Sequence, residues 1–141
     1  MRRILVPVDG SENSERAIRH AISLFKENPS VELLVLNVQL PIESGLVHQF
    51  IGKELIDRYY ADEGATMLAS AKQLLDDAGV RYTASVATGH IGETIANYAN
   101  QQRCDHIVMG TRGMGALKNL VVGSIATKVI HLVEVPVTLV K

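Results

Sequence analysis

The stretch Ile107-Val108-Met109-Gly110-Thr111-Arg112-Gly113-Met114-Gly115 joins a short apolar run to a segment with three glycines. An apolar run of this length, ended by glycine, is typical of a strand buried in a parallel sheet. Farther along, Gly123-Ser124 precedes Ile125, Val129 and Leu132, whose spacing of three and four residues predicts a helix. The sequence here therefore predicts a buried strand, a glycine-rich loop and a helix in succession, as in an α/β fold.

The glycines of this loop fit an anion site. Glycine is favoured where φ is positive or where a ligand approaches the backbone closely. Gly110, Gly113 and Gly115 at a strand end, with Gly123-Ser124 at a helix start, offer backbone N–H groups to phosphate oxygens. The helix dipole favours negative charge at the same place. From spacing alone two interpretations remain open: a phosphate-binding loop and a plain glycine-rich connection.

The composition is that of one globular domain spanning residues 1–141. Hydrophobic residues make up 47% of the chain and charged residues 21%, which is ordinary for a protein with a buried core. The net charge of −1 indicates neither a nucleic acid nor a membrane partner. Pro7 and Asp9 interrupt the first apolar run too early for a signal peptide. The single Cys104 excludes an intrachain disulfide framework, and we expect a cytoplasmic protein.

Strands and helices are predicted to alternate along the chain. Apolar, β-branched runs predict strands at 3–8, 31–38, 105–109 and 135–140, and a less regular apolar–polar alternation predicts an outer strand at 80–88. The first helix is expected to begin after Ser11 as its N-cap and to end at Asn28-Pro29. Further helices are predicted at 53–78, at about 93–102 and at about 124–132. Residues 39–52 are expected to form a mobile loop with one helical turn at most.

The long helix at 53–78 is expected to turn one apolar face to the core. We predict that this face consists of Leu55, Tyr59, Ala65, Leu68, Ala71, Leu74 and Leu75. Gly64 lies in the middle of the helix and is expected to weaken it, and Gly79 follows the helix where a C-terminal glycine cap belongs.

The order βαβαβαβαβ predicts a single doubly wound, five-stranded parallel sheet with helices on both faces. In such sheets, ligands bind beyond the carboxyl ends of the strands, where the strand order reverses. Two loops carry suitable residues: Asp9-Gly10-Ser11 after the first strand and the glycine-rich loop after the fourth. They converge only if those strands are neighbours, which selects the order 3-2-1-4-5 over 2-1-3-4-5.

Asp9 would then face the glycine-rich loop across the sheet end. A carboxylate is poorly suited to contact phosphate but well suited to accept hydrogen bonds from ribose hydroxyls. Asp9 also has a structural alternative as a turn or capping residue, and its local sequence fits both roles equally.

Other nucleotide-binding and catalytic signatures fail. A P-loop needs Gly-Lys-Ser/Thr, but Gly115 is followed by Ala116. His90-Ile91-Gly92 matches three of the four His-x-Gly-His positions of nucleotidylyl transferases, but Glu93 replaces the second histidine. The five histidines show no metal-ligand spacing, and Cys104 has no motif around it. Without a positioned base, nucleophile or metal cluster, we expect no efficient catalysis.

Three motifs resemble the universal stress protein family. They are Val6-Pro7-Val8-Asp9-Gly10-Ser11, the spaced pattern Gly110-x2-Gly113-x9-Gly123-Ser124, and Val135-Pro136-Val137. The likeness extends over the whole chain, and the glycine spacing is that of the ATP-binding branch. It implies a Rossmann-like fold of the adenine nucleotide alpha hydrolase type, with ATP as the ligand. It also implies a magnesium ion held mainly by the phosphates.

The resemblance also assigns roles to residues. Asp9 would hold the ribose, Val8 would line the adenine pocket, and the backbone of Val38 would meet the adenine edge. The remaining implied contacts are Met109 and Gly110 along the nucleoside, Gly113, Gly123, Ser124 and Ile125 at the phosphates, and Arg112 at a variable position of the loop.

Family members often pair through their last strand, which implies a homodimer through residues 135–141. The alternative is a monomer in which Pro136 and Lys141 blunt that edge. The function implied is that of an ATP-binding regulatory protein of stress responses that is not an enzyme. The alternatives are a weak ATPase or nucleotidyl-transfer enzyme and a nucleotide-free dimeric scaffold. The protein partner and the stress signal are not specified by the sequence.

Overall fold

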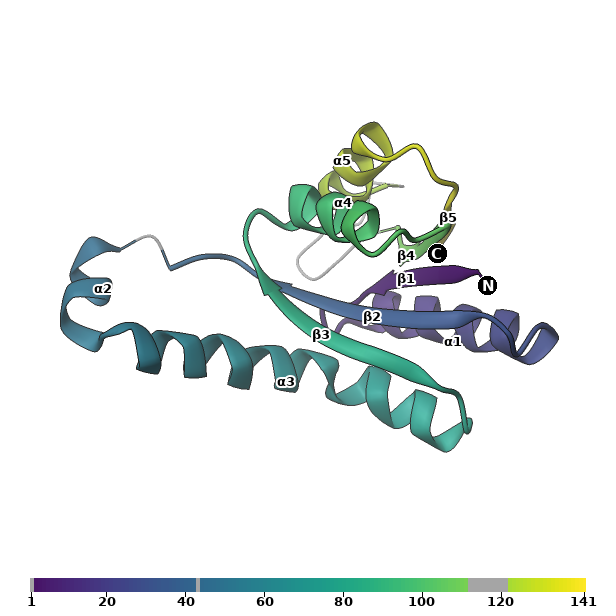
Figure 1. Ribbon diagram of the computed structural model, residues 1–141, viewed down its shortest axis with the longest axis horizontal. Helices are drawn as coiled ribbons and strands as arrows, with labels where there is room; N and C mark the ends of the chain where they lie inside the picture. Colours follow the sequence, from purple (N-terminus) through teal and green to yellow (C-terminus); the bar gives the residue numbers. More distant parts are fainter. Residues whose placement is uncertain (1, 43, 112–121) are drawn as a thin grey trace.

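A computed structural model describes residues 2–42, 44–111 and 122–141. Strands and helices alternate along the chain, apart from two successive helices after the second strand (Figure 1). The elements are β1 (Arg3–Pro7), α1 (Glu12–Glu27), β2 (Glu32–Gln39), α2 (Gly45–Ile51), α3 (Lys53–Asp77), β3 (Tyr82–Thr88), α4 (Ile91–Gln101), β4 (His106–Gly110), α5 (Ser124–Leu132) and β5 (Val137–Val140).

The strands form one five-stranded sheet in the order β3-β2-β1-β4-β5, and every neighbouring pair is parallel. The predicted order is therefore confirmed, with β1 between β2 and β4. Helices α1 and α3 pack on one face of the sheet, and α4 and α5 pack on the other (Figure 1). The chain winds outward from β1 in both directions, so the strand order reverses between β1 and β4.

Alternating side chains of the central strands supply two separate hydrophobic cores. In β2, Leu33 and Val35 face the core under α1 and α3, whereas Leu34, Leu36 and Val38 face the core under α4 and α5. All five side chains are buried. Burial on both faces explains why this strand is a nearly continuous apolar run in the sequence.

Pro7 lies at the last position of β1, as expected for a residue that cannot donate to a sheet ladder. A proline also precedes the last strand. The carbonyl of Pro136 accepts from the N–H of Ile107, but regular pairing of β5 with β4 begins at Val137. The predicted strand at 135–140 was therefore two residues too long at its start.

The first helix has the predicted ends. The side chain of Ser11 accepts from the N–H of Ser14 at 3.2 Å, which satisfies one of the helix's open donors. At the other end, the N–H of Asn28 donates to the carbonyl of Leu24 at 3.0 Å, and Pro29 follows outside the helix.

The prediction that residues 39–52 form a loop with one turn at most was wrong. They contain α2, whose seven residues begin after Ser44, and the side chain of Ser44 accepts from the N–H of Val47 at 3.3 Å. The preceding chain is fixed at Ile42, whose N–H donates to the hydroxyl of Tyr60 at 2.7 Å and whose carbonyl lies 2.6 Å from Nε2 of His48. Tertiary bonds from α3 therefore position this segment.

The predicted apolar face of α3 was correct only in its second half. Leu68, Ala71 and Leu75 are buried, and Leu74 packs beside them. Leu55, Tyr59 and Ala65 are exposed, whereas Ile56 and Gly64 are buried. Spacings of three or four residues link Gly64, Leu68, Ala71 and Leu75 along the buried face, and Ile56 lies eight residues before Gly64.

Gly64 lets α3 approach β3. A Cβ atom at Gly64 would overlap Cγ2 of Val86 and would lie 2.7 Å from its Cγ1. Valine is stiff about χ1, so this neighbour has little freedom to move. The glycine is thus a packing requirement that outweighs its low helix propensity.

We expect Gly64→Ala to destabilise the protein by about 1–3 kcal/mol, because overpacking outweighs the roughly 1 kcal/mol that alanine contributes as a better helix former. Denaturant unfolding measures the change. The control is Gly45→Ala in α2, where a Cβ atom would meet no atom within 4 Å. A stabilised Gly64→Ala variant, or one that Val86→Ala does not restore, would contradict the packing role.

His106 links β4 to β5, because its Nε2 lies 2.7 Å from Oγ1 of Thr138. Burial lowers the pKa of the His106 ring below its ordinary 6.5, and the nearby charges of Arg2 and His20 lower it further. The folded state therefore disfavours the protonated ring, whereas the unfolded chain does not.

The free energy of unfolding should consequently fall as the pH decreases below about 6.5. Urea unfolding at pH 7.5, 6.5 and 5.5 measures this dependence. It should become shallower in His106→Gln, which keeps a side chain able to bond Thr138, and remain unchanged in the control His131→Gln at the exposed end of α5. An identical pH dependence in His106→Gln would refute the assignment.

Candidate functional site

The carboxyl ends of β1, β2 and β4 bring most of the sequence-predicted residues to one end of the sheet. Val8 and Asp9 follow β1, Val38 lies at the end of β2, and Met109 and Gly110 end β4. Because β1 pairs directly with both β2 and β4, these positions are neighbours at the point where the strand order reverses. Three residues of the predicted site, Arg112, Gly113 and Gly115, lie outside the described residues.

Asp9 makes the predicted turn. Its Oδ1 accepts from the N–H of Ser11 at 2.9 Å, and its own N–H donates to Oγ of Ser14 at 3.3 Å. Gly10 has φ +80°, and its missing Cβ would lie 3.3 Å from Sδ of Met67. The structural alternative for Asp9 is thus observed. It does not conflict with a ligand role, since a carboxylate accepts several hydrogen bonds at once.

The backbone of Val38 faces the space past the end of β1. The N–H of Val8 donates to the carbonyl of Leu36 at 2.8 Å, so the polar groups of Leu36 point toward β1. In a strand, this orientation recurs at every second residue. Val38 is the next such position, and regular pairing of β1 with β2 ends at Pro7 and Leu36. The sheet register therefore directs an N–H and a carbonyl of Val38 toward this end.

Asn37 is a functional candidate that the sequence analysis missed. Its side chain is buried, and Nδ2 donates to the carbonyl of Val8 at 2.9 Å while Oδ1 accepts from Nε2 of Gln39 at 2.6 Å. The amide thereby fixes the end of β1 immediately before Asp9. Its signal was an asparagine inside an otherwise apolar strand, where a buried polar side chain requires partners.

Gly110 serves packing between β4 and α1. A Cβ atom there would overlap Oδ1 of Asn13 and would lie 2.7 Å from its Cγ. Asn13 is itself buried, and its Nδ2 donates to the carbonyl of Val140 at 3.1 Å. The expectation that glycine serves only positive φ or a ligand was incomplete here, because a protein side chain occupies the space that Gly110 leaves.

The chain closes on itself between the end of β4 and the start of α5. The N–H of Thr111 donates to Val140, and its carbonyl accepts from the N–H of Gly123 at 2.6 Å. The N–H of Gly123 is therefore engaged within the protein, contrary to the expectation that these glycine amides are open donors. The next donors are those of Ser124 and Ile125, in the first turn of α5, which has no side-chain cap.

Several other sequence candidates lie away from this end. Cys104 is buried, and burial raises the pKa of its thiol to about 11, so it remains protonated at neutral pH and suits the predicted structural role. His90 is the residue before α4, as expected of a helix entry. Within the described ranges, the structure shows no group of three His, Cys, Asp or Glu side chains that could hold a metal ion.

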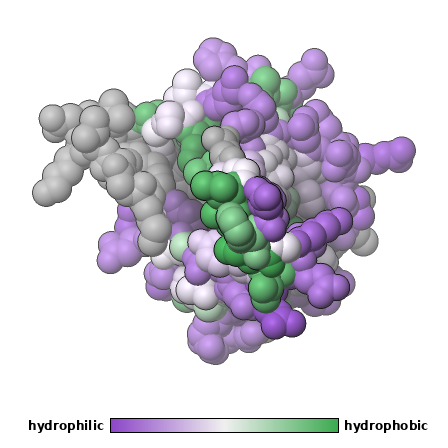
Figure 2. All heavy atoms as spheres, turned by 90° about the vertical axis from the view of Figure 1, so that its left-hand side faces the viewer, coloured by the Kyte–Doolittle hydropathy of each residue, from purple (hydrophilic) through white to green (hydrophobic). Residues whose placement is uncertain are grey.

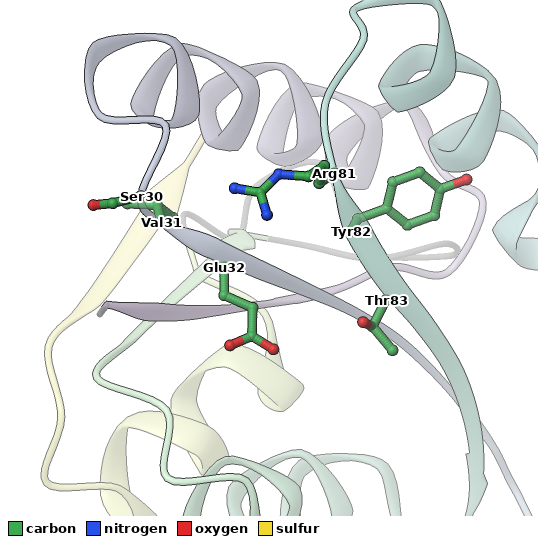
Figure 3. A pocket seen from close by; sticks show the side chains of 6 residues that line it. All are labelled: Ser30, Val31, Glu32, Arg81, Tyr82 and Thr83. Atoms are coloured by element: carbon green, nitrogen blue, oxygen red, sulfur yellow. The ribbon is translucent and has the colours of Figure 1, made fainter.

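A hollow of about 340 Å³ lies at the opposite end of the sheet, beside the amino ends of β2 and β3 (Figure 3). It is lined by Ser30, Val31, Glu32, Arg81, Tyr82 and Thr83. Its charged groups serve the fold: Glu32 pairs with Arg3 at 2.9 Å, and Arg81 donates to the carbonyl of Pro29 at 3.0 Å. The Tyr82 side chain points away from that of Arg81 (Figure 3) and donates to Asp76. The charged groups that line the hollow are therefore engaged in contacts within the protein.

We expect Gly110→Ala to destabilise the fold by about 1–3 kcal/mol through the clash with Asn13. Thermal unfolding measures the loss. Part of it should be recovered in Gly110→Ala/Asn13→Ala, relative to Asn13→Ala alone, since the shorter side chain vacates the contact. Strictly additive effects of the two substitutions would show that the contact is unimportant.

None of the described helices is long and apolar enough to cross a membrane.

Among curated proteins, the universal stress protein YxiE of Bacillus subtilis is 31% identical over 148 residues, covering 99% of this chain and 98% of that protein. Among solved structures, MJ0577 of Methanocaldococcus jannaschii is 29% identical, with a TM-score of 0.84 over 99% of this chain and 95% of that chain.

The universal stress protein of Archaeoglobus fulgidus, solved in complex with dAMP, has the same fold at 22% identity, with a TM-score of 0.69 over 100% of this chain and 98% of that chain. The family model of the universal stress proteins matches residues 1–141. With the confirmed strand order and the polar residues at its reversal point, these findings show that the chain belongs to the universal stress protein family.

Proposed function

We propose that this protein binds ATP at the carboxyl ends of β1, β2 and β4 and acts as a nucleotide-sensitive regulator in stress responses. The observation that supports this proposal is the convergence of Asp9, the Val38 backbone and the first turn of α5 at the point where the strand order reverses. The complex of the Archaeoglobus fulgidus relative with dAMP supports an adenine nucleotide as the ligand.

The adenine end of the ligand would lie beside β1 and β2. Val8, Val38 and Met109 are buried apolar residues at the ends of their strands, and they suit the faces of a base. An adenine edge offers a donor and acceptors, and the backbone N–H and carbonyl of Val38 have the matching chemistry. Gly110 would border the nucleoside on the side of β4.

The ribose and phosphates would extend from Asp9 toward α5. Asp9 would accept from the ribose hydroxyls while it keeps its bond to Ser11. The phosphates would meet the first-turn N–H groups of Ser124 and Ile125, where the dipole of this nine-residue helix favours an anion. Gly123 would contribute by its missing side chain, and the predicted residues Arg112 and Gly113 would complete the contact. Magnesium would be held mainly by the phosphates.

Regulation would follow from ordering of the polypeptide around the nucleotide, without catalytic turnover. We propose a binding protein of the cytoplasm that is not an enzyme. A homodimer would form through residues 135–141. The support for pairing is that β5 is an edge strand: among the described residues, no further strand pairs with its outer side.

Nucleotide released by acid from freshly purified protein tests the proposal. We expect an adenine nucleotide, identified by mass, whose amount stays constant during incubation. Steady conversion to product would instead indicate an enzyme, and protein that neither carries nor binds a nucleotide would reject the proposal.

We also expect Asp9→Ala to weaken binding of ATP and of adenosine at least tenfold, because hydrogen bonds to a charged group contribute about 1.5–3 kcal/mol. Binding of tripolyphosphate, which has no ribose, should be unchanged. Titration calorimetry measures all three ligands, and Asp62→Ala on the exposed side of α3 is the control. Asp9→Asn should lose less, because its amide oxygen can still accept from Ser11. Equal losses for ATP and tripolyphosphate would count against a ribose contact.

A further inference from the structure

Five large apolar side chains are exposed together on α2 and the start of α3. They are Leu46, Phe50, Ile51, Leu55 and Tyr59, with exposed fractions between 44% and 79%. We call this surface the α2–α3 patch. Figure 2 shows apolar atoms gathered across the end of the molecule where α2 lies, with hydrophilic atoms around them. The patch is remote from β5, which is the edge strand at the end of the sheet opposite to β3 (Figure 1).

The patch is held in place by specific bonds. Ile42 is bonded through its N–H to Tyr60 and through its carbonyl to His48, so the chain before α2 is tied to both helices. Ser44 caps α2, and the rings of Tyr59 and Tyr60 lie 6.0 Å apart at a tilt of 60°. The apolar side chains are therefore presented on a defined surface.

The size of the patch is that of a protein interface. A large apolar side chain exposes on the order of 200 Å² when free, so five at about half exposure present roughly 500 Å². The largest apolar patch of a typical monomer is about 300–600 Å² and often functional. Two such patches would bury about 1,000 Å², which is the lower limit for a specific interface.

The charges around the patch are self-complementary. Lys53, Glu54, Asp57 and Arg58 are all exposed and carry no net charge. Helical geometry places Glu54 and Arg58 one turn apart on the same side of the stripe formed by Leu55 and Tyr59. In two antiparallel helices related by a two-fold axis, the same sides face each other in reversed order, so each Arg58 meets a Glu54 of the other copy.

We propose that the α2–α3 patch is a second homotypic interface, in which the starts of two α3 helices pack antiparallel around a two-fold axis. The neutral rim does not suit an anionic membrane surface, which favours lysine and arginine around an apolar face. The proposed interface lies apart from β5, so it does not require pairing through that strand. If β5 also pairs, the two surfaces together build assemblies larger than a dimer.

The first test compares mass in solution, by sedimentation velocity from 5 to 200 µM, between wild type and Phe50→Glu. The wild-type mass should rise with concentration, and the mass of the variant should be no more than half that of wild type at the highest concentration. Ile130→Glu, at another exposed apolar side chain, on α5 and outside the patch, is the control and should retain the wild-type mass. Equal masses of wild type and Phe50→Glu would overturn the proposal.

Charge reversal distinguishes a second copy from any other partner and leaves the apolar residues intact. Glu54→Arg and Arg58→Glu should each weaken association at least tenfold, because like charges then meet across the axis. The double variant Glu54→Arg/Arg58→Glu, and an equimolar mixture of the two single variants, should restore the wild-type mass. Unaltered association in both single variants would refute the antiparallel arrangement.

A flotation assay with vesicles of phosphatidylcholine and phosphatidylserine tests whether the α2–α3 patch binds a membrane instead of a second copy. Wild-type protein should stay with the soluble fraction. Vesicle binding that Phe50→Glu abolishes, together with equal solution masses, would assign the patch to a membrane and overturn the proposal.

Discussion

The hydrogen bond from the N–H of Val8 to the carbonyl of Leu36 is the last regular link between β1 and β2, and the candidate site depends on where it falls. Beyond it, β2 continues to Gln39 in register with β3, while β1 turns away through Asp9 and Gly10. The central strand β1 thus ends before its neighbour β2 does. Backbone groups of β2 that would otherwise bond to β1 are directed toward the place where a ligand would lie.

Asn37 maintains this arrangement from inside the protein. A carbonyl at the end of a shortened strand needs a donor, and the side chain of Asn37 supplies it to Val8. The bond lies where regular pairing of β1 with β2 ends. The cost of a polar residue in the core is offset here because both ends of its amide are bonded.

Much of this architecture was predictable from local sequence. The strand order followed from a single requirement, that the Asp9 turn and the glycine-rich loop lie together, and α5 begins at Ser124 as the Gly123-Ser124 pair predicted. The segment before α3 was not predictable, because the N–H of Ile42 is bonded to Tyr60 of α3, a contact that only the tertiary structure brings about. The buried face of α3 was missed at its start, because apolar residues there form two stripes and sequence does not show which one meets the sheet.

The contribution of Gly110 was also beyond local sequence. The pattern indicated that a side chain is excluded, and a bound ligand was the expected reason. The structure supplies a neighbour within the protein, Asn13, whose position depends on the packing of α1 over β4. The glycines of one spaced motif can therefore meet different physical requirements, and only the structure shows which requirement each glycine meets.

The bond between Thr111 and Gly123 has a consequence for how such proteins diversify. Thr111 is bonded to Val140 of β5 and to Gly123 at the start of α5, so the two ends of the intervening segment are held together by bonds outside that segment. Loop-closure entropy rises slowly, by about 0.6 kcal/mol for each doubling of a flexible loop. Insertions between these two residues are therefore inexpensive for folding, so related proteins can differ in chain length there and inherit the same scaffold.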